Sequence, residues 1–293
     1  MRTNCAGCAG CCIDWRPIAP ESIEHERGGA RDPLDDLYNF VPLTRDDVRG
    51  LLDAGLADAM VPRLWHADGR GVEIDGTELA ALDGLPVFFL GLRKPPKPVG
   101  PFGTDPTWLS TCAFLDPRTL QCRIHDAAIY PEECAEYPGH NLALSVDTEC
   151  ERVERAFGEE RLLDESVPEG LSGLLLGPQA IGQKLFVHPD PDRLDGVVAR
   201  LTDDALTAED RAEFVAAAAA ANPGTTAVEM AAFERERARV RDSRSWVGRS
   251  IEEWIERAGE PGARTEASGT PADPSLAEAI EDERGAPPTP GWE

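Results

Sequence analysis

Cysteines are the residues of this sequence whose type and spacing best suit chemistry. Four of them fall within eight positions near the start of the 293-residue chain, and the other four lie between positions 112 and 150. Thiols that cluster in this way are typical of metal ligands, because a bound metal deprotonates them and holds them together. Scattered core cysteines and disulfides are the alternatives. We predict metal ligation by all eight: Cys5, Cys8, Cys11, Cys12, Cys112, Cys122, Cys134 and Cys150.

The spacing of the first four cysteines bears on the kind of metal. Cys5, Cys8 and Cys11 follow the C-x2-C-x2-C pattern with which bacterial ferredoxins hold part of a [4Fe–4S] cluster. Zinc sites more often combine two separate C-x2–4-C turns, and the sequence has no second turn of this kind. The spacing therefore favours an iron–sulfur cluster and leaves a zinc ion open. Cys12 directly follows Cys11, and adjacent side chains diverge along an extended backbone, so one of the two should serve a second centre or stay free.

The wider pattern resembles the YkgJ-type cysteine-cluster family, which is named for its CxxCxxCC signature. The matching segments are Cys5–Cys12, Cys112–Leu115 and Cys122–Pro138, with Cys150 as the last of eight cysteines. That family is described as zinc- or iron-chelating, so the resemblance implies metal chelation by about residues 1–150, with redox or electron-transfer roles. Its relatives include flagellin lysine methylases, which implies a cluster-assisted protein lysine N-methyltransferase as the alternative function.

The net charge excludes several classes of partner. The chain has 54 acidic and 29 basic residues, which gives a formal charge of -25. Repulsion from phosphates and anionic lipids opposes binding to nucleic acid or to a membrane surface, and no apolar run of about 18 residues predicts a membrane span. The metal ion or cluster is therefore the partner we expect, and a protein partner stays unknown. Eight thiols without an apolar signal near the start predict a reducing, cytoplasmic location.

The same acidity predicts adaptation to a salty cytosol. Only three of the 29 basic residues are lysines, and dissolved ions screen the repulsion between surface carboxylates. We expect the thermal unfolding midpoint to rise from low to molar KCl, as followed by circular dichroism. A midpoint that stays constant across this range would leave the simpler interpretation, an ordinary acidic protein.

Other polar residues are weaker candidates. His125 and His140 follow Cys122 and Cys134 closely enough to be ligands or proton carriers, although ordinary core or surface histidines are favoured. Glu132 and Glu133 precede Cys134. We favour their interpretation as carboxylates at a helix start over a role as catalytic acids. The sequence contains no phosphate-binding, zinc-protease, nucleophile-elbow or methyl-donor motif. It therefore assigns no catalytic residue and leaves open whether the protein is an enzyme.

The elements that must position the cysteines predict an α+β fold. Residues 1–165 should form an irregular cysteine-rich metal-binding module with short strands and helices, 166–259 a mainly helical region, and 260–293 a disordered acidic tail. Within the module we expect a helix capped by Thr44, a hairpin through residues 68–71, a buried strand at 87–92, a loop at 94–106 and a helix at 148–163. The later helices are predicted at 193–201, 207–221, 225–241 and 245–258.

Overall fold

A computed structural model describes residues 1–20, 31–259 and 272–291, and within them the fold is a mixture of helices and small sheets, as predicted. The helices are α1 (Arg45–Asp53), α2 (Glu132–Glu136), α3 (Gly139–Leu144), α4 (Glu149–Phe157), α5 (Val197–Thr202), α6 (Ala208–Ala220), α7 (Met230–Arg241), α8 (Trp246–Gly259) and α9 (Leu276–Ile280). The strands are β1 (Arg2–Thr3), β2 (Met60–Arg63), β3 (Gly71–Ile74), β4 (Thr77–Leu82), β5 (Leu85–Leu92), β6 (Pro96–Val99), β7 (Thr107–Ser110), β8 (Leu115–Asp116), β9 (Gln121–Cys122), β10 (Leu162–Asp164) and β11 (Phe186–Val187).

The largest sheet is antiparallel and is organised around β5, which confirms the buried strand predicted at 87–92. Its order is β11-β5-β4-β3, and β2 also pairs with β5. The hairpin predicted through residues 68–71 is wrong. Strand β3 turns instead into β4 through Asp75 and Gly76, whose positive φ angles of 53° and 76° suit a two-residue hairpin turn.

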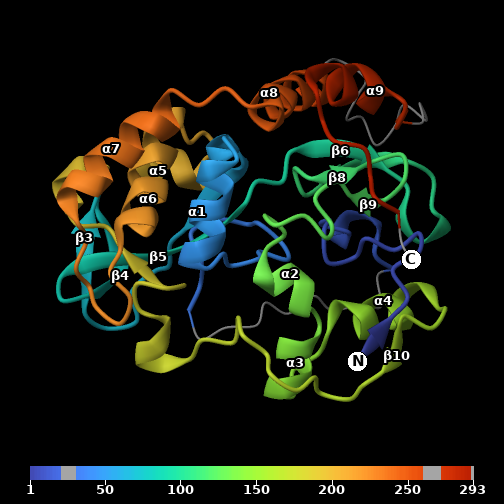
Figure 1. The fold of residues 1–293 in the computed structure, drawn as a ribbon, viewed down its shortest axis with the longest axis horizontal. Coiled ribbons are helices and arrows are strands. Elements are labelled where there is room, and N and C mark those ends of the chain that lie inside the picture. Colours follow the sequence, from blue (N-terminus) through green and yellow to red (C-terminus); the bar gives the residue numbers. More distant parts are fainter. Residues whose placement is uncertain (21–30, 260–271, 292–293) are drawn as a thin grey trace.

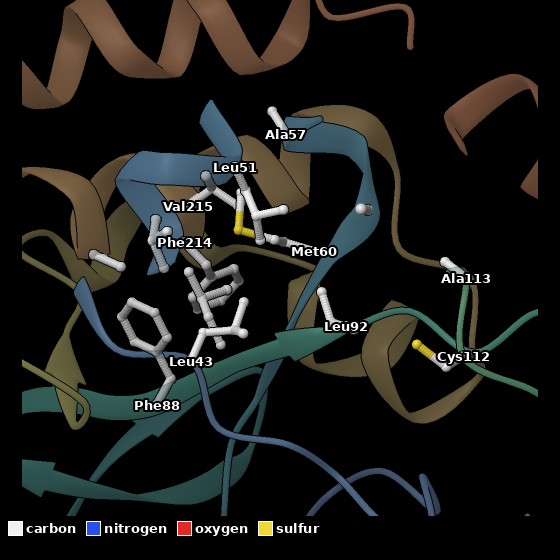
Figure 2. Close-up of a cluster of buried hydrophobic side chains, with 14 of the residues drawn as sticks. Leu43, Leu51, Ala57, Met60, Phe88, Leu92, Cys112, Ala113, Phe214 and Val215 are labelled. Atoms are coloured by element: carbon white, nitrogen blue, oxygen red, sulfur yellow. The ribbon is translucent and has the colours of Figure 1, made fainter. Parts of the chain in front are cut away.

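Two helices cover this sheet and close the main core. Thr44 caps α1 as predicted, because its hydroxyl accepts from the Asp47 amide while the Asp47 carboxylate accepts from the Thr44 amide. In α6 the alanine run lets neighbouring backbones approach closely, and the Phe214 ring meets Phe88 of β5 edge to face at 5.0 Å. Figure 2 shows these rings with Leu43 and Leu51 between β5, α1 and α6. One apolar cluster extends from Cys8 to Ile251 and so includes residues from both predicted units.

A buried carboxylate on α6 ties this core to its neighbours. The carboxylate of Glu213 lies 2.9 Å from Arg193 and 3.0 Å from Arg237 of α7, and His188 Nε2 lies 3.4 Å away. Burial alone would raise the pKa of Glu213, but hydrogen bonds from His188 and Arg193 lower it to about 2. The ionised form is therefore favoured more in the folded state than in the unfolded one.

This lowered pKa predicts how stability changes in acid. The contribution of Glu213 is fully present above its ordinary pKa of 4.5 and is lost as the pH falls through about 2. At about 1.4 kcal/mol per pKa unit, we expect a loss of at most about 3 kcal/mol across this window. Urea unfolding from pH 6 to 2 should show a shallower decline for Glu213→Gln than for the wild type. The exposed Glu256→Gln should follow the wild type, and equal slopes for all three proteins would contradict the assignment.

The prediction of a disordered tail is wrong for residues 272–291, whereas 260–271 and 292–293 lie outside the described residues. Here α9 packs beside α8 (Figure 1), and Glu281, directly after α9, is fully buried. Its carboxylate lies 2.6 Å from Lys97 Nζ and 2.9 Å from Arg123 Nε, and it accepts from Trp254 Nε1 at 2.9 Å. Composition alone misled the prediction, because a few buried ion pairs can order a segment that is otherwise rich in Gly, Pro and acidic residues.

The predicted loop at 94–106 is also partly wrong. Residues 96–99 form β6, whose prolines at 96 and 98 alternate with Lys97 and leave the lysine amide free to pair with Leu109 of β7. The Lys97 side chain is buried and only 1% exposed. In the described part of the chain, no helix is long and apolar enough to cross a membrane.

Candidate thiol-lined site

All eight cysteines line one cavity of about 1070 Å³. They come from four separate parts of the chain: the loop at 5–12, the segment around β8 and β9, α2 and α4. Each is a free thiol. The structure therefore brings together every cysteine that the sequence analysis selected, across up to 145 positions of sequence between Cys5 and Cys150.

The first cysteines lie on two consecutive tight turns. The Cys8 amide donates to the Cys5 carbonyl at 3.1 Å, and the Cys12 amide donates to the Ala9 carbonyl at 2.8 Å. Gly10 between them has no space for a side chain, because a Cβ there would lie 2.9 Å from Val153 Cγ2. The loop is thus packed tightly against α4.

Helix α4 brings Cys150 to the cavity and is held by a buried carboxylate. Thr148 and Glu151 form a capping box at its start. Glu149, which is 5% exposed, accepts from Trp15 Nε1 at 2.8 Å and from the Tyr38 hydroxyl at 3.0 Å. The predicted helix at 148–163 is shorter than expected, because Gly158 ends it with a φ of 75°.

The segment around β8 and β9 brings two further thiols to the cavity. The Cys112 amide donates to the Cys12 carbonyl at 2.8 Å, so the two cysteines share a backbone contact. Cys122 lies in β9, opposite Leu115 of β8. The buried Lys97 ammonium donates to the carbonyls of Ala113 and Leu115 at 3.0 and 2.8 Å, and thereby fixes the backbone between Cys112 and Cys122.

Helix α2 contributes Cys134, whose carbonyl accepts from the Tyr130 hydroxyl at 3.3 Å. The Tyr130 ring also lies 5.0 Å from the ring of His125, which lines the cavity as the sequence analysis allowed for a ligand or proton carrier. The ring nitrogens of His140 lie 3.0 and 2.6 Å from the carboxylate oxygens of Glu133 and Glu136. It is thus a buried partner of carboxylates, which agrees with the favoured interpretation of a core histidine.

Comparison with known proteins identifies a family. The model of a family of unknown function, DUF7531, matches residues 1–293. The chain belongs to the DUF7531 family. No curated protein and no solved structure matches this DUF7531 chain.

The resemblance to the YkgJ-type family is therefore wrong. The family model that covers the whole DUF7531 chain is a different one, and the described residues contain no group of three or more His, Cys, Asp or Glu side chains arranged to hold a metal ion. A CxxCxxCC run specifies only a local turn, and turns of this kind fit into different folds. The lysine methyltransferase alternative came from that resemblance and stays untested.

Buried surroundings keep the thiols of this DUF7531 chain protonated. Burial raises the pKa of Cys8 and Cys122 to about 12, against a usual value of 9.0. A metal that binds here must therefore displace protons, which makes binding weaker as the pH falls. Lys94 also lines the cavity and places a basic side chain beside the thiols. Burial lowers the pKa of Lys94, while the charges of the Cys112, Cys12 and Cys11 thiolates act to raise it.

Sequence reasoning missed Lys94, although a signal was present. The chain contains only three lysines, and each makes a specific contact close to the cysteine segments. Lys94 donates to the Tyr38 carbonyl at 2.9 Å, Lys97 pairs with Glu281, and Lys184 pairs with Glu133 at 2.5 Å. In a chain that otherwise uses arginine, the position of each lysine is informative.

One pair of thiols in the cavity is in direct contact. Cys11 Sγ and Cys12 Sγ lie 3.8 Å apart, which is the separation that Zn–S bonds of about 2.3 Å produce in a tetrahedron. No third ligand joins this pair closely enough to hold an ion among the described residues. An iron–sulfur cluster is wider than a single ion, and its thiolates stand farther apart.

Proposed function

We propose that this protein binds an iron–sulfur cluster through its cysteines. The observation that carries the proposal is that eight free thiols from four segments line one cavity of about 1070 Å³. Eight free thiols around one cavity are a hazard without a metal, because uncoordinated thiols that lie close together form disulfides under oxidation. Coordination removes this hazard and satisfies the thiolates at the same time.

Iron–sulfur is favoured over zinc because the thiols line the wall of a cavity and do not converge on one point. A bound cluster supplies one-electron transfer. The protein's own residues would hold the thiolates, while Lys94 would offset part of their negative charge and the ring of Tyr130 would limit access of water. Free thiols in this number belong to a reducing compartment, so we propose a cytoplasmic location.

Elemental analysis of anaerobically purified protein tests the proposal directly. We expect iron and acid-labile sulfide in equal amounts, with a broad visible absorption that bleaches on reduction. Zinc without sulfide, in colourless protein, would support a thiolate–zinc site instead. Protein that takes up neither iron nor zinc, before or after reconstitution, would overturn metal binding altogether.

The Cys8→Ser and Cys122→Ser variants test the ligands. Each change removes one thiolate, so each should lower the bound metal and the melting temperature of the anaerobic protein. The matched control is Ala6→Ser, which adds the same hydroxyl at an exposed position between Cys5 and Cys8. Full metal content and wild-type melting in both cysteine variants would contradict the two assignments.

A further inference from the structure

We propose that a smaller cavity elsewhere in the fold binds a phosphate-type oxyanion through four arginines. This cavity has a volume of about 40 Å³ and shares no lining residue with the thiol-lined cavity, so the inference does not depend on the proposed function. It lies where four parts of the chain meet: residues 57–58 before β2, the residue directly after β5, the start of α6, and the segment from the end of α7 into α8. The arginines that line it are Arg93, Arg211, Arg244 and Arg249.

The two half-buried arginines of this cavity are held by backbone carbonyls. Arg93 donates to the Asp58 carbonyl at 3.2 Å, and Arg211 donates to the Leu206 carbonyl at 2.5 Å. Neither forms an ion pair with any residue that the structure describes. A carbonyl fixes a guanidinium group without cancelling its charge, and one such bond leaves most of its N–H donors available to a ligand.

The other two arginines provide access from solvent. Arg244 and Arg249 are exposed, so a dissolved anion can reach the cavity from their side. They too are held by carbonyls: Arg244 donates to the Ser243 carbonyl at 2.6 Å, and Arg249 donates to the Arg244 carbonyl at 2.7 Å. All four guanidinium groups are thus positioned while their charge stays uncompensated.

The carboxylates that line the cavity do not balance this charge. There are two of them, Asp58 and Glu252, against four arginines, which leaves an excess of two positive charges. The Asp58 carboxylate is engaged at the start of α8, where it accepts from the amide of Ser245 at 2.9 Å and from its hydroxyl. Glu252 is exposed and, within the part of the chain that the structure describes, forms no ion pair.

The two half-buried guanidinium groups also repel each other. Burial and the charge of Arg211 lower the pKa of Arg93 to about 10, although the charges of Asp58, Asp204 and Glu252 act to raise it. The nearby carboxylates therefore offset only part of the cost of placing two cations together. A bound anion would offset the remainder.

The size of the cavity and the shape of its donors select the kind of anion. A water molecule needs about 10–15 Å³ of such space, so about 40 Å³ suits a small inorganic ion and excludes a nucleotide. The planar fork of a guanidinium group donates two parallel hydrogen bonds to the oxygens of a phosphate, which favours an oxyanion over a spherical ion such as chloride. The net charge of -25 opposes binding only weakly, because dissolved salt screens distant charges beyond about 8–10 Å.

Calorimetric titration of the anaerobic full-length protein with inorganic phosphate tests the site, with the ionic strength held constant by potassium chloride. We expect one phosphate per chain. Arg93→Gln and Arg211→Gln should each weaken binding about tenfold or more, because each removes hydrogen bonds from a charged donor. The matched control is Arg235→Gln, which changes an exposed arginine of α7 that pairs with Glu236 and should bind phosphate like the wild type.

Two further variants act at exposed positions, where the fold tolerates substitution. Arg244→Gln should weaken phosphate binding, and it keeps the test valid if a half-buried arginine proves necessary for folding. Glu252→Gln should have the opposite effect and strengthen binding, because it removes a negative charge from the lining. Glu256→Gln lies one turn later on α8 and should leave the affinity unchanged.

Glycerol phosphate separates two sources of the oxyanion. Binding as tight as that of inorganic phosphate would assign the site to the phosphate group of a larger molecule, whereas binding of inorganic phosphate alone would assign it to the free ion. A wild-type protein that binds no phosphate, or that binds chloride equally well at the same ionic strength, would overturn the proposal. Wild-type affinity in the Arg93, Arg211 and Arg244 variants would overturn it as well, because the phosphate would then be bound elsewhere.

Discussion

The Glu281→Ala variant is expected to lose about 3–5 kcal/mol of unfolding free energy, because it leaves buried positive charge without its partner. Glu281 is fully buried and faces both Lys97 and Arg123, which are themselves 1% and 4% exposed. It also accepts the indole N–H of Trp254, which packs at the same point. The change therefore leaves Lys97 without its ion-pair partner and the Trp254 N–H without its acceptor, while Arg123 keeps its contacts with Asp116 and Asp282.

Urea unfolding followed by tryptophan fluorescence measures this loss. Glu283→Ala is the matched control, since it deletes an exposed carboxylate two residues later in the same turn and should change stability by less than about 0.5 kcal/mol. Glu281→Gln keeps the shape and loses only the charge, so it should fall between the two. A Glu281→Ala protein as stable as Glu283→Ala would show that the buried ion group contributes nothing.

The Trp15→Ala variant is expected to lose about 3–5 kcal/mol as well, through a cavity in the core next to the first cysteines. Trp15 is fully buried and meets Tyr38, Phe102 and Phe157 edge to face, with ring centroids 5.8–6.4 Å apart. Its N–H donates to Glu149, which directly precedes Cys150. Truncation thus removes the packing that aligns α4 with the N-terminal loop.

Trp15→Phe separates the two contributions of this residue. It keeps most of the ring and removes the N–H donor, so it should lose about 1–3 kcal/mol, the usual result of leaving a buried acceptor without its donor. Differential scanning calorimetry of the metal-free proteins measures both changes without an effect of metal affinity. Equal melting temperatures for Trp15→Ala and wild type would contradict the role of Trp15 in the core.

The sequence predicted the gathering of the cysteines but not the way in which the fold achieves it. Thiol clustering in the sequence is strong because cysteine is rare and two-residue spacings force a turn, so Cys5 to Cys12 stood out. The segments that carry Cys112 and Cys150 are held by Lys97 and Glu149, whose partners Glu281 and Trp15 lie more than 100 positions away. Nothing local in the sequence marks such partners.

The difference between local signals and distant contacts also explains which fold predictions were wrong. Capping and apolar periodicity predicted α1 and the four later helices to within a few residues, because these signals act within one or two turns. Strand pairing failed at residues 68–71, since the Asp-Gly signal there competes with a second one at Asp75 and Gly76. The loop and the tail were predicted from composition alone. Both predictions failed because Lys97 and Glu281 are buried and order the segments that carry them.

The pairing of Arg123 with Glu281 has a consequence for the newly made chain. The two residues are 158 positions apart, so at ribosomal rates of about 5–20 residues per second roughly 8–30 s pass between their synthesis. During this interval the peptide that bears Cys122 has been translated but lacks the carboxylate that later secures it. Under the proposed function, cluster assembly is therefore expected to follow translation of the helix α9 region, and cells short of iron should accumulate the completed polypeptide without a cluster.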